Sequence, residues 1–316
     1  MVGESPLNIV VLAGGDSAER EVSLDSGRAV VNALAQRGHA VTSVDPATTL
    51  LTEYCWDRAD VAFLALHGPF GEDGQVQAIL DRIGVPYTGS DAAASRLAFS
   101  KSASKECFLA NGIPTPSYVL IHRSDSAARI REQAETIGFP IVVKPDSQGS
   151  SLGVSLVPSR GQLNAAIELC FQFDDHGLIE SAIDGTEWTV GLIDEELLPA
   201  IQIETDRDYF DFNAKYQSET TRYLFEFDVG RDIVDSIESI SRATCVALGT
   251  RGIVRVDLRL DHEGSPWVLE ANTIPGFTDH SLIPKAAARL GISFGELCEM
   301  AVHSVLSATV AQPQTQ

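Results

Sequence analysis

The side chains best suited to chemistry lie on two strands that a short polar turn connects. Segments 252–260 and 266–271 are rich in apolar and β-branched residues, and Asp-His-Glu-Gly-Ser between them is typical of a turn. Pairing around the centre of the turn brings two pairs face to face: Asp257 with Glu270, and Arg255 with Asn272. Because side chains alternate along a strand, Arg255 and Asp257 share one face, as do Glu270 and Asn272.

Two facing carboxylates need a compensating charge. At about 5 Å and an effective dielectric constant near 20 they repel by roughly 3 kcal/mol. A hard divalent cation would balance them, and the oxygens of Asp257, Glu270 and Asn272 suit magnesium, which commonly bridges such ligands to nucleotide phosphates. The alternative is an ordinary exposed hairpin whose charges Arg255 and water satisfy.

A lysine followed by small residues ends another expected strand. Lys144 precedes Pro-Asp-Ser-Gln-Gly-Ser-Ser-Leu-Gly, and small residues let backbone N–H groups approach phosphate oxygens while the lysine supplies positive charge. The segment is not a Walker loop, because G-x-x-x-x-G-K-[ST] occurs nowhere in the chain. A plain β-hairpin loop explains this pattern equally well.

Two further polar segments follow the first strands of the chain. Gly14-Gly15 begins a turn where doubly wound sheets bind their ligands, and Asp45 ends the next strand as the ribose-binding acid of a dinucleotide fold does. The third glycine of that fold is absent, and Glu19 and Glu21 would repel a pyrophosphate, so a cationic amine suits this turn better than NAD. His67 ends a later apolar strand at the same edge, where by itself a structural histidine is the simpler interpretation.

The elements that position these residues indicate two architectures. Strands expected at the start of the chain, at 40–44 and at 61–66 alternate with helices at 24–37 and 75–83, which predicts a parallel, doubly wound first domain. A helix over 92–111, ended by Gly112 and Pro114, leads into strands joined by short loops. The fold class is therefore α/β followed by α+β, in three parts: a Rossmann-like domain 1–98, a central lobe 99–185 and a C-terminal lobe 186–316.

Composition limits the partners. The 316 residues carry 44 acidic and 23 basic side chains, and the net charge of −21 disfavours nucleic acid and anionic membranes. Five scattered cysteines without a C-x-x-C indicate neither a zinc site nor a disulfide framework. The first residues lack the basic and long apolar segments of a signal peptide, so we expect a cytoplasmic protein.

Taken together, the motifs resemble those of the D-alanine–D-alanine ligases of the ATP-grasp superfamily. The similar segments run in order along nearly the whole chain: GGDSAEREVSLDSG at 14–27, ALHGPFGEDG at 65–74, VPYTGS at 85–90, VVKPDSQGSSLGVS at 142–155, AKY at 214–216, RVDLRLD at 255–261 and LEANTIPGFTDHSLIP at 269–284. The resemblance implies an ATP-grasp fold in which the two later lobes enclose ATP.

The resemblance also implies roles for individual residues. The ATP contacts would be Lys101, Lys144 and Lys215 with Ser150 and Ser151 near the phosphates, Glu180 and the backbone of Ser181 to Ile183 at the adenine, and Glu187 at the ribose. Two magnesium ions, for which manganese can substitute, would be bound by Asp257, Glu270 and Asn272. Glu19 would orient the ammonium group of the first D-alanine beside His67, and Ser281 with the backbone of Leu282 would hold the carboxylate of the second.

The implied reaction passes through an acyl phosphate and then a tetrahedral intermediate, whose oxyanion Arg255 and the Gly276 N–H would stabilise. Glu19, Ser150 and Tyr216 would form a hydrogen-bonded trio that positions the loop over the site, with the general base left open. The product places the enzyme in peptidoglycan precursor synthesis, working on ATP and D-alanine, with a homodimer as a further expectation.

Two alternatives stay open at this point. A related ligase could use D-lactate, D-serine or another amino acid as acceptor, although Tyr216 after Lys215 favours D-alanine. Segment 217–231 departs from the family because it lacks a proline-alanine pair and carries Leu-Phe-Glu-Phe at 224–227. A non-catalytic nucleotide-binding protein or a Rossmann oxidoreductase is the alternative of another class, against which the intact ligand residues and the missing third glycine argue.

Overall fold

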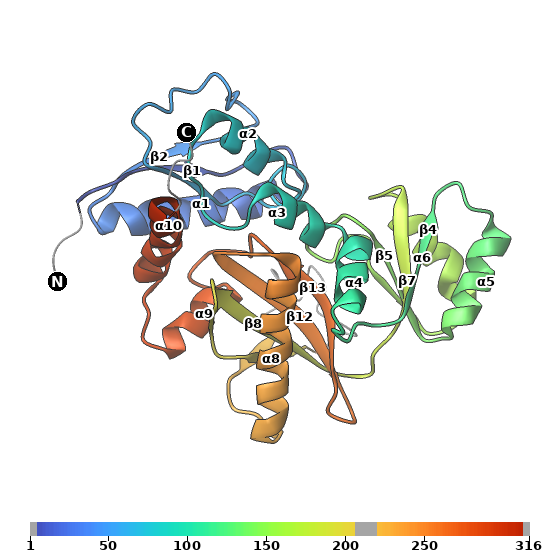
Figure 1. The fold of residues 1–316 in the computed structure, drawn as a ribbon. Coiled ribbons are helices and arrows are strands. Elements are labelled where there is room, and N and C mark those ends of the chain that lie inside the picture. The colour runs from blue at the N-terminus through green and yellow to red at the C-terminus, as the bar shows by residue number, and fades with distance from the viewer. Residues whose placement is uncertain (1–4, 206–219, 312–316) are drawn as a thin grey trace.

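Three β-sheets organise the molecule. The computed structural model describes residues 5–205 and 220–311, with side chains as far as residue 307. Within that part of the chain the strands form a three-stranded, a four-stranded and a six-stranded sheet. Figure 1 shows the N-terminal sheet at the top, the four-stranded lobe to the right and the six-stranded sheet below, with α4 between the two later sheets.

The N-terminal sheet is parallel, as the alternating pattern predicts. Its order is β2-β1-β3, formed by Asn8–Leu12 (β1), Ala40–Val44 (β2) and Val61–Leu64 (β3). All four residues of β3 are buried, which is typical of a parallel strand covered on both faces. The accompanying helices are α1 (Arg20–Gln36) and α2 (Gln75–Ile83). Beyond these three strands, Tyr87 forms a single parallel bridge with Ala62.

The single helix expected over 92–111 is wrong, because two helices occupy these residues. They are α3 (Ala92–Phe99) and α4 (Lys101–Ala110), and Ser100 between them has an extended backbone with φ −82° and ψ 112°. The Ser100 hydroxyl accepts from the Ala103 N–H and so caps the second helix. The break turns α4 into a separate element whose first residue is Lys101.

The four-stranded sheet is antiparallel and forms the central lobe. Its order is β4-β7-β5-β6. The strands are Tyr118–His122 (β4), Ile141–Pro145 (β5), Ser155–Val157 (β6) and His176–Ser181 (β7), with helices Ala127–Ile137 (α5), Arg160–Gln162 (η1, a 3₁₀ turn) and Leu163–Cys170 (α6). Because β5 pairs with β6, the loop after Lys144 is a hairpin loop, and Ser150 and Ser151 in it have positive φ.

The six-stranded sheet contains the hairpin with the facing carboxylates. Its path is β11-β10-β8-β12-β13, with β9 paired to β8. The elements of this region are Gly185–Ile193 (β8), Glu196–Leu197 (β9), Ile201–Glu204 (β10), Arg222–Leu224 (β11), Arg231–Leu248 (α8), Ile253–Asp261 (β12) and Pro266–Asn272 (β13). Helix α8 packs on β8, β12 and β13.

The predicted hairpin register is confirmed at the site. Asp257 pairs with Glu270 and Arg255 with Asn272. Near the turn, however, Leu260 pairs with Pro266, and a bulge after Asp257 restores the predicted pairing by adding one residue to β13. The sequence pattern gives no sign of this bulge.

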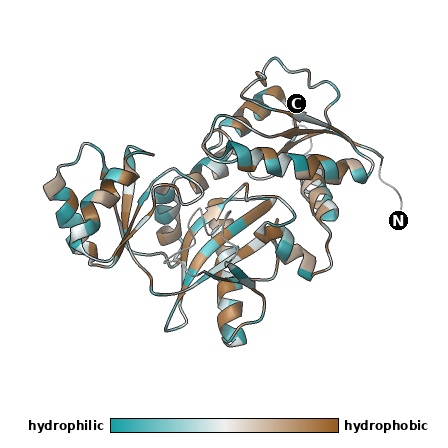
Figure 2. Ribbon diagram, turned by 180° about the vertical axis from the view of Figure 1, so that it is seen from behind, coloured by the Kyte–Doolittle hydropathy of each residue, from teal (hydrophilic) through white to brown (hydrophobic). Residues whose placement is uncertain are grey.

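The last two helices return to the first sheet. Helix α9 covers Leu282–Arg289, and α10 covers Phe294–Ala311 and packs on α1. One apolar cluster therefore combines Val30 and Leu34 of α1 with Leu297 and Val302 of α10. Figure 2 shows hydrophobic residues concentrated along the strands and hydrophilic ones on the outer faces of the helices. No described helix is long and apolar enough to cross a bilayer.

The predicted division of the chain stays a prediction. The expected boundaries at 98/99 and 185/186 lie within one residue of the end of α3 and the start of β8. The cores do not follow these boundaries strictly, since α10 completes the core of the first sheet.

Candidate active site

A cavity opens between the four-stranded and six-stranded sheets. Its empty volume, including space open to solvent, is about 810 Å³, and it is called the first cavity below. Its lining comes from α4, both sheets and the hairpin loop: Lys101, Val142, Lys144, Pro145, Gln148, Ser151, Leu152, Val154, Glu180, Ser181, Ile183, Glu187, Asp257, Arg259, Leu269 and Glu270. In a chain with net charge −21, the two lysines supply the local positive charge that an anionic ligand requires.

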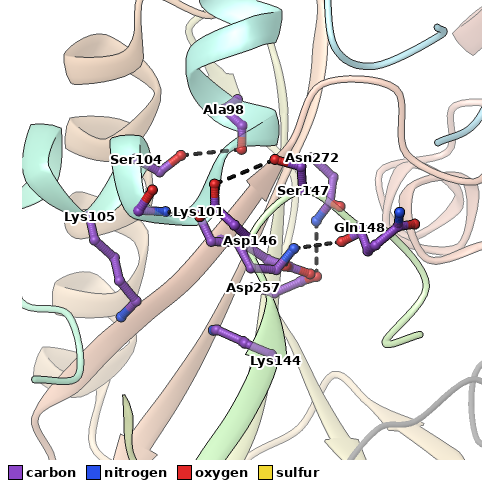
Figure 3. Close-up of polar contacts among 12 residues, drawn as sticks. Ala98, Lys101, Ser104, Lys105, Lys144, Asp146, Ser147, Gln148, Asp257 and Asn272 are labelled. Carbon is purple, nitrogen blue, oxygen red and sulfur yellow. Dashed lines mark hydrogen bonds and ion pairs between the residues drawn. The ribbon is translucent and has the colours of Figure 1, made fainter. Parts of the chain in front are cut away.

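The N-terminus of α4 is held against the hairpin loop. The Asp146 backbone carbonyl accepts from the Lys101 N–H at 3.0 Å, and its carboxylate accepts from the Ser102 N–H at 2.7 Å. The Lys101 ammonium donates to the Gln148 carbonyl at 2.5 Å and lies 3.5 Å from Glu270 (Figure 3). Asp146 thus fixes where Lys101 enters the cavity.

Lys144 shares a buried carboxylate with another lysine. Its ammonium lies 2.6 Å from one Glu180 oxygen, and the Lys105 ammonium lies 3.0 Å from the other. Burial alone would raise the pKa of Glu180, but the charges of Lys105 and Lys144 outweigh it, so that pKa is lowered. Figure 3 shows Lys101 and Lys105 on the same helix with Lys144 nearby.

The connection from β7 to β8 presents a backbone donor to the first cavity. The N–H groups of Ser181 and Ala182 donate to Ser117 and Pro140 carbonyls. Ile183 is half-buried and lines the first cavity, and no described residue accepts from its N–H. This N–H suits an acceptor on a ligand.

The facing carboxylates are balanced by cations of the chain. Arg255 forms two hydrogen bonds to Asp257, at 2.9 and 2.7 Å, and the Asn272 amide donates to Asp257 at 3.1 Å (Figure 3). Thr189, buried in β8, donates to the same carboxylate at 2.7 Å and fixes its orientation. No group of three acidic, histidine or cysteine ligands exists among the described residues, and the candidate set consists of two carboxylates and one amide. All three offer the hard oxygen donors that magnesium prefers.

A second cavity lies beyond Arg255. It encloses about 990 Å³ and is lined by α1, β12 and the start of α9: Glu21, Val22, Asp25, Ser26, Tyr223, Arg255, Gly276, Thr278, His280, Ser281 and Leu282. Ser281 is the N-cap of α9, whose first turn presents backbone N–H groups. This helix start and Arg255 suit a carboxylate, and Glu21 and Asp25 suit an ammonium group.

Glu19 joins the first domain to the hairpin loop. The Ser150 hydroxyl donates to its carboxylate. A Cβ added to Gly68 or Gly149 would lie 2.9 or 2.6 Å from a Glu19 oxygen, so both glycines are needed for the close approach. Ser150 itself has φ 51°, a left-handed conformation in which the loop brings its hydroxyl to Glu19.

His67 is a neutral, fully hydrogen-bonded side chain. Its Nδ1 lies 3.1 Å from the Ile274 carbonyl and must carry the proton, so Nε2 accepts from Ser26 at 3.2 Å. Burial lowers the pKa of His67 to about 4. Nearby, burial and the charge of Glu19 raise the pKa of Glu72 to about 8, while its carboxylate accepts from the Gly68 N–H.

Comparison with known proteins identifies the family. Residues 108–303 match the family model for the D-ala D-ala ligase C-terminus, and residues 46–90 match that for the N-terminus. The chain is 42% identical to the D-alanine–D-alanine ligase of Gloeobacter violaceus over 95% of its own length and 100% of that relative. The chain belongs to the D-alanine–D-alanine ligase family.

Solved structures of ligases agree with this membership. The D-alanine–D-alanine ligase of Bacillus anthracis complexed with ATP is similar with a TM-score of 0.85 and 30% identity, over 96% of this chain and 98% of that one. The VanG D-Ala:D-Ser ligase of Enterococcus faecalis is similar with a TM-score of 0.84 and 26% identity, over 95% and 100% of the two chains. The expected ATP-grasp fold is confirmed.

The site residues expected from ligase motifs fall into two groups in space. The first cavity is lined by Lys101, Lys144, Ser151, Glu180, Ser181, Ile183, Glu187, Asp257 and Glu270, and the second by Arg255, Gly276, Ser281 and Leu282. Glu19, Ser150, His67 and Asn272 lie between or beside them. Lys215 and Tyr216 lie outside the described residues. Which of these residues contact substrate stays a prediction.

Asp45 does not resemble a ribose-binding acid in its contacts. Its carboxylate accepts from the Gly15 N–H at 2.9 Å and pairs with Arg20 at 2.6 Å. A Cβ on Gly14 would lie 2.6 Å from that carboxylate. Asp45 therefore fixes the first turn of the ligase, which suits the expectation against an NAD site there.

Several residues of the site were missed by sequence reasoning. Lys105, Asp146, Thr189 and Arg259 all support predicted site residues, and Glu72 holds the backbone of Gly68, next to His67. Lys105 had a usable signal, because it lies four residues after Lys101 and so on the same helix face. Thr189 and Arg259 carry no local signal, since their partners come from other strands.

Proposed function

We propose that this protein joins two D-alanine molecules into D-alanyl-D-alanine while converting ATP to ADP and phosphate, in peptidoglycan precursor synthesis. The observation that carries the proposal is the position of Arg255 and Asp257. They lie two residues apart on one face of β12, 2.7 Å from each other, and Asp257 lines the first cavity while Arg255 lines the second. A phosphate donor in one cavity and an amino acid in the other would meet at this pair.

ATP fits the first cavity. The Ile183 N–H would donate to the adenine, Glu187 would accept from the ribose, and Lys101 and Lys144, which line the same cavity, would contact the phosphates. Carboxylate attack on the γ-phosphate brings two anions together, so the lysines would supply electrostatic stabilisation. Magnesium, bound by Asp257, Glu270 and Asn272, would neutralise phosphate charge, and manganese has the same ligand preference.

The second step, in which the second D-alanine attacks the acyl phosphate, would take place at the second cavity. Glu19 would hold the ammonium group of the first D-alanine, whose carboxylate becomes the acyl phosphate. The second D-alanine would place its carboxylate at Ser281 and the Leu282 N–H, and its amine would attack the acyl carbon and expel phosphate. Arg255 and the Gly276 N–H would stabilise the resulting oxyanion.

The neutral state of His67 limits its part in this scheme. A histidine with a pKa of about 4 cannot act as a general acid at neutral pH. Its hydrogen bond to Ile274 instead holds the segment that leads to Gly276. We propose that it positions this segment beside the substrate.

The setting of the reaction is also part of the proposal. ATP and free D-alanine are small polar molecules, and we place the enzyme in the cytoplasm without nucleic-acid or membrane partners. A homodimer is a further expectation, which sedimentation velocity would test.

The decisive experiment is product identification. The purified protein would be incubated with ATP, magnesium and D-alanine, with L-alanine as the control, and phosphate release and product mass would be measured. We expect stereospecific release and a D-alanyl-D-alanine mass. If product forms only when D-serine or D-lactate is added, that compound is the acceptor in place of D-alanine. Equal phosphate release with L-alanine would refute the proposal.

A further inference from the structure

Lys105 is an unusual residue to find completely buried. Its side chain is 0% exposed, which places it among the largest fully buried side chains of the described chain. A buried ammonium group persists only when its hydrogen-bonding capacity is used and its charge is compensated. Both conditions hold here, and the carboxylate that compensates the charge, Glu180, also lines the first cavity.

The Lys105 ammonium has three partners inside the protein. It donates to the Thr115 hydroxyl at 2.7 Å and to the Pro116 carbonyl at 3.1 Å, and it forms an ion pair with Glu180 at 3.0 Å. Since this side chain is 0% exposed and does not line the first cavity, it is not placed to contact a ligand there. Thr115 in turn donates to the Val268 carbonyl of β13, which ties this lysine to the six-stranded sheet.

Lys144 differs in this respect. Within the described chain its ammonium contacts only Glu180, at 2.6 Å, and it lines the first cavity. Two of its donors therefore stay available for phosphate oxygens. The Glu180 carboxylate is therefore shared by Lys105, which is buried away from the first cavity, and Lys144, which lines it.

Lys105, Glu180 and Lys144 form a triad of charges, and its net charge sets the electrostatic attraction for a nucleotide in the first cavity. Lys144 and Glu180 alone would form a neutral pair, and the carboxylate would compete with phosphate for the ammonium group. With Lys105 the triad carries a net charge of +1, and each oxygen of Glu180 lies beside a different lysine. The distances are short enough for strong coupling in a site with little water.

We propose that Lys105 is a positioning residue of the nucleotide site, which keeps Glu180 from neutralising Lys144 and so leaves the positive charge of Lys144 to the ATP phosphates. This inference rests on the proposed function for the identity of the ligand only. It assigns to Lys105 no contact with ATP, so its effect must pass through Glu180 and Lys144.

The test compares nucleotide binding across a charge series. ATP affinity would be measured calorimetrically with magnesium and without D-alanine. The triad carries a charge of +1 in the wild type, 0 in Lys105→Met, +2 in Glu180→Gln and +1 in the double variant. We expect Lys105→Met to weaken ATP binding about tenfold, equivalent to about 1.4 kcal/mol. The double variant should return to within about threefold of the wild type, because Lys144 is no longer neutralised.

Two controls separate charge from damage to the fold. Arg160→Met removes an equally positive but exposed side chain, 67% accessible and paired with Glu135, and should leave ATP affinity unchanged. Inorganic tripolyphosphate, bound in place of ATP, should give the same order of variants, because it lacks the adenine near Glu180. If Lys105→Met does not fold, Glu180→Gln is compared with the double variant. Because the effect of Lys105 passes through Glu180, the two should bind tripolyphosphate within about threefold of each other, and a larger difference would overturn the inference.

The pH dependence gives an independent reading. Burial lowers the pKa of Lys105 to about 8, against the opposing influence of Glu180. The charged groups facing it are Glu180 and Lys144, and the Tyr118 ring lies 5.2 Å from its ammonium, with Glu106 hydrogen-bonded to the Tyr118 hydroxyl. Wild-type ATP affinity should therefore fall between pH 7 and pH 9 by more than that of Lys105→Met.

The outcomes distinguish this inference from the proposed function. Unchanged ATP binding in Lys105→Met, or a double variant that binds no better than Lys105→Met, would overturn the role of Lys105 even if the protein makes D-alanyl-D-alanine. Failure to form the dipeptide, with the expected order of ATP affinities, would overturn the proposed function and leave the triad standing.

Discussion

Replacing His67 by glutamine should remove part of the acid sensitivity of the folded protein. His67 is held neutral, because its Nδ1–H donates to Ile274 and its Nε2 accepts from Ser26 in a buried setting. Glutamine offers one donor and one acceptor as well, but it does not titrate. The difference between the two proteins therefore measures the free energy of unfolding that is lost because the folded state disfavours protonation of His67.

The magnitude follows from the pKa of the folded state. Burial lowers the pKa of His67 from 6.5 to about 4. The unfolded chain therefore takes up the proton first as the pH falls, so stability is present above pH 6.5 and is lost as the pH drops from there through 4. At pH 5 about 97% of unfolded and about 9% of folded molecules carry the proton, which lowers the free energy of unfolding by about 2 kcal/mol relative to pH 7.5.

Urea unfolding followed by tryptophan fluorescence would measure this difference. We expect the wild type to lose about 2 kcal/mol more than His67→Gln between pH 7.5 and pH 5. Other titrating groups are common to both proteins and cancel in the comparison. Equal losses in the two proteins would show that His67 is not held neutral, and the assignment of its tautomer would fall with it.

Three other substitutions test the site. Glu270→Gln should lower turnover by at least about a hundredfold at saturating magnesium with an unchanged circular dichroism spectrum, because one of the two facing carboxylates is lost; near-normal phosphate release would contradict the metal assignment. Gly149→Ala places a Cβ 2.6 Å from a Glu19 oxygen and should lower kcat/KM for D-alanine about tenfold or more. The control is Gly161→Ala, which should have no effect because its Cβ meets no atom within 4 Å. Ser281→Ala should raise the KM for the second D-alanine about tenfold while the KM for ATP stays constant; a change confined to ATP would refute the assignment of the second cavity.

The first sheet and the facing carboxylates could be predicted because their signals are local. Continuous apolar runs give β1 and β3, the stop at Gly38 marks the start of β2, and the turn at 261–265 gives the pairing of Asp257 with Glu270. The turn is centred half a residue from the position that the sequence predicts, which alone would shift the pairing by one residue. The bulge in β13 cancels this shift, so the predicted pairing of Asp257 with Glu270 is correct.

The rest of the site depends on contacts between distant parts of the chain. Ser100 divides a continuous helical pattern because its hydroxyl caps α4 and also donates to Asp146, 46 residues away. The burial of Lys105 likewise requires Glu180 and Thr115 from other elements. Helix periodicity places Lys105 on the same face as Lys101, but neither propensity nor periodicity shows which distant residues Ser100 and Lys105 contact.

The return of α10 to the first sheet has a consequence for how the chain emerges from the ribosome. His39 and Glu299 are hydrogen-bonded although 260 positions separate them, and Leu297 and Val302 complete the core around Val30 and Leu34. The part of α1 that α10 covers is synthesised early and stays uncovered until α10 has been made. Contacts between residues so far apart in sequence slow folding and leave this surface available to chaperones during that time.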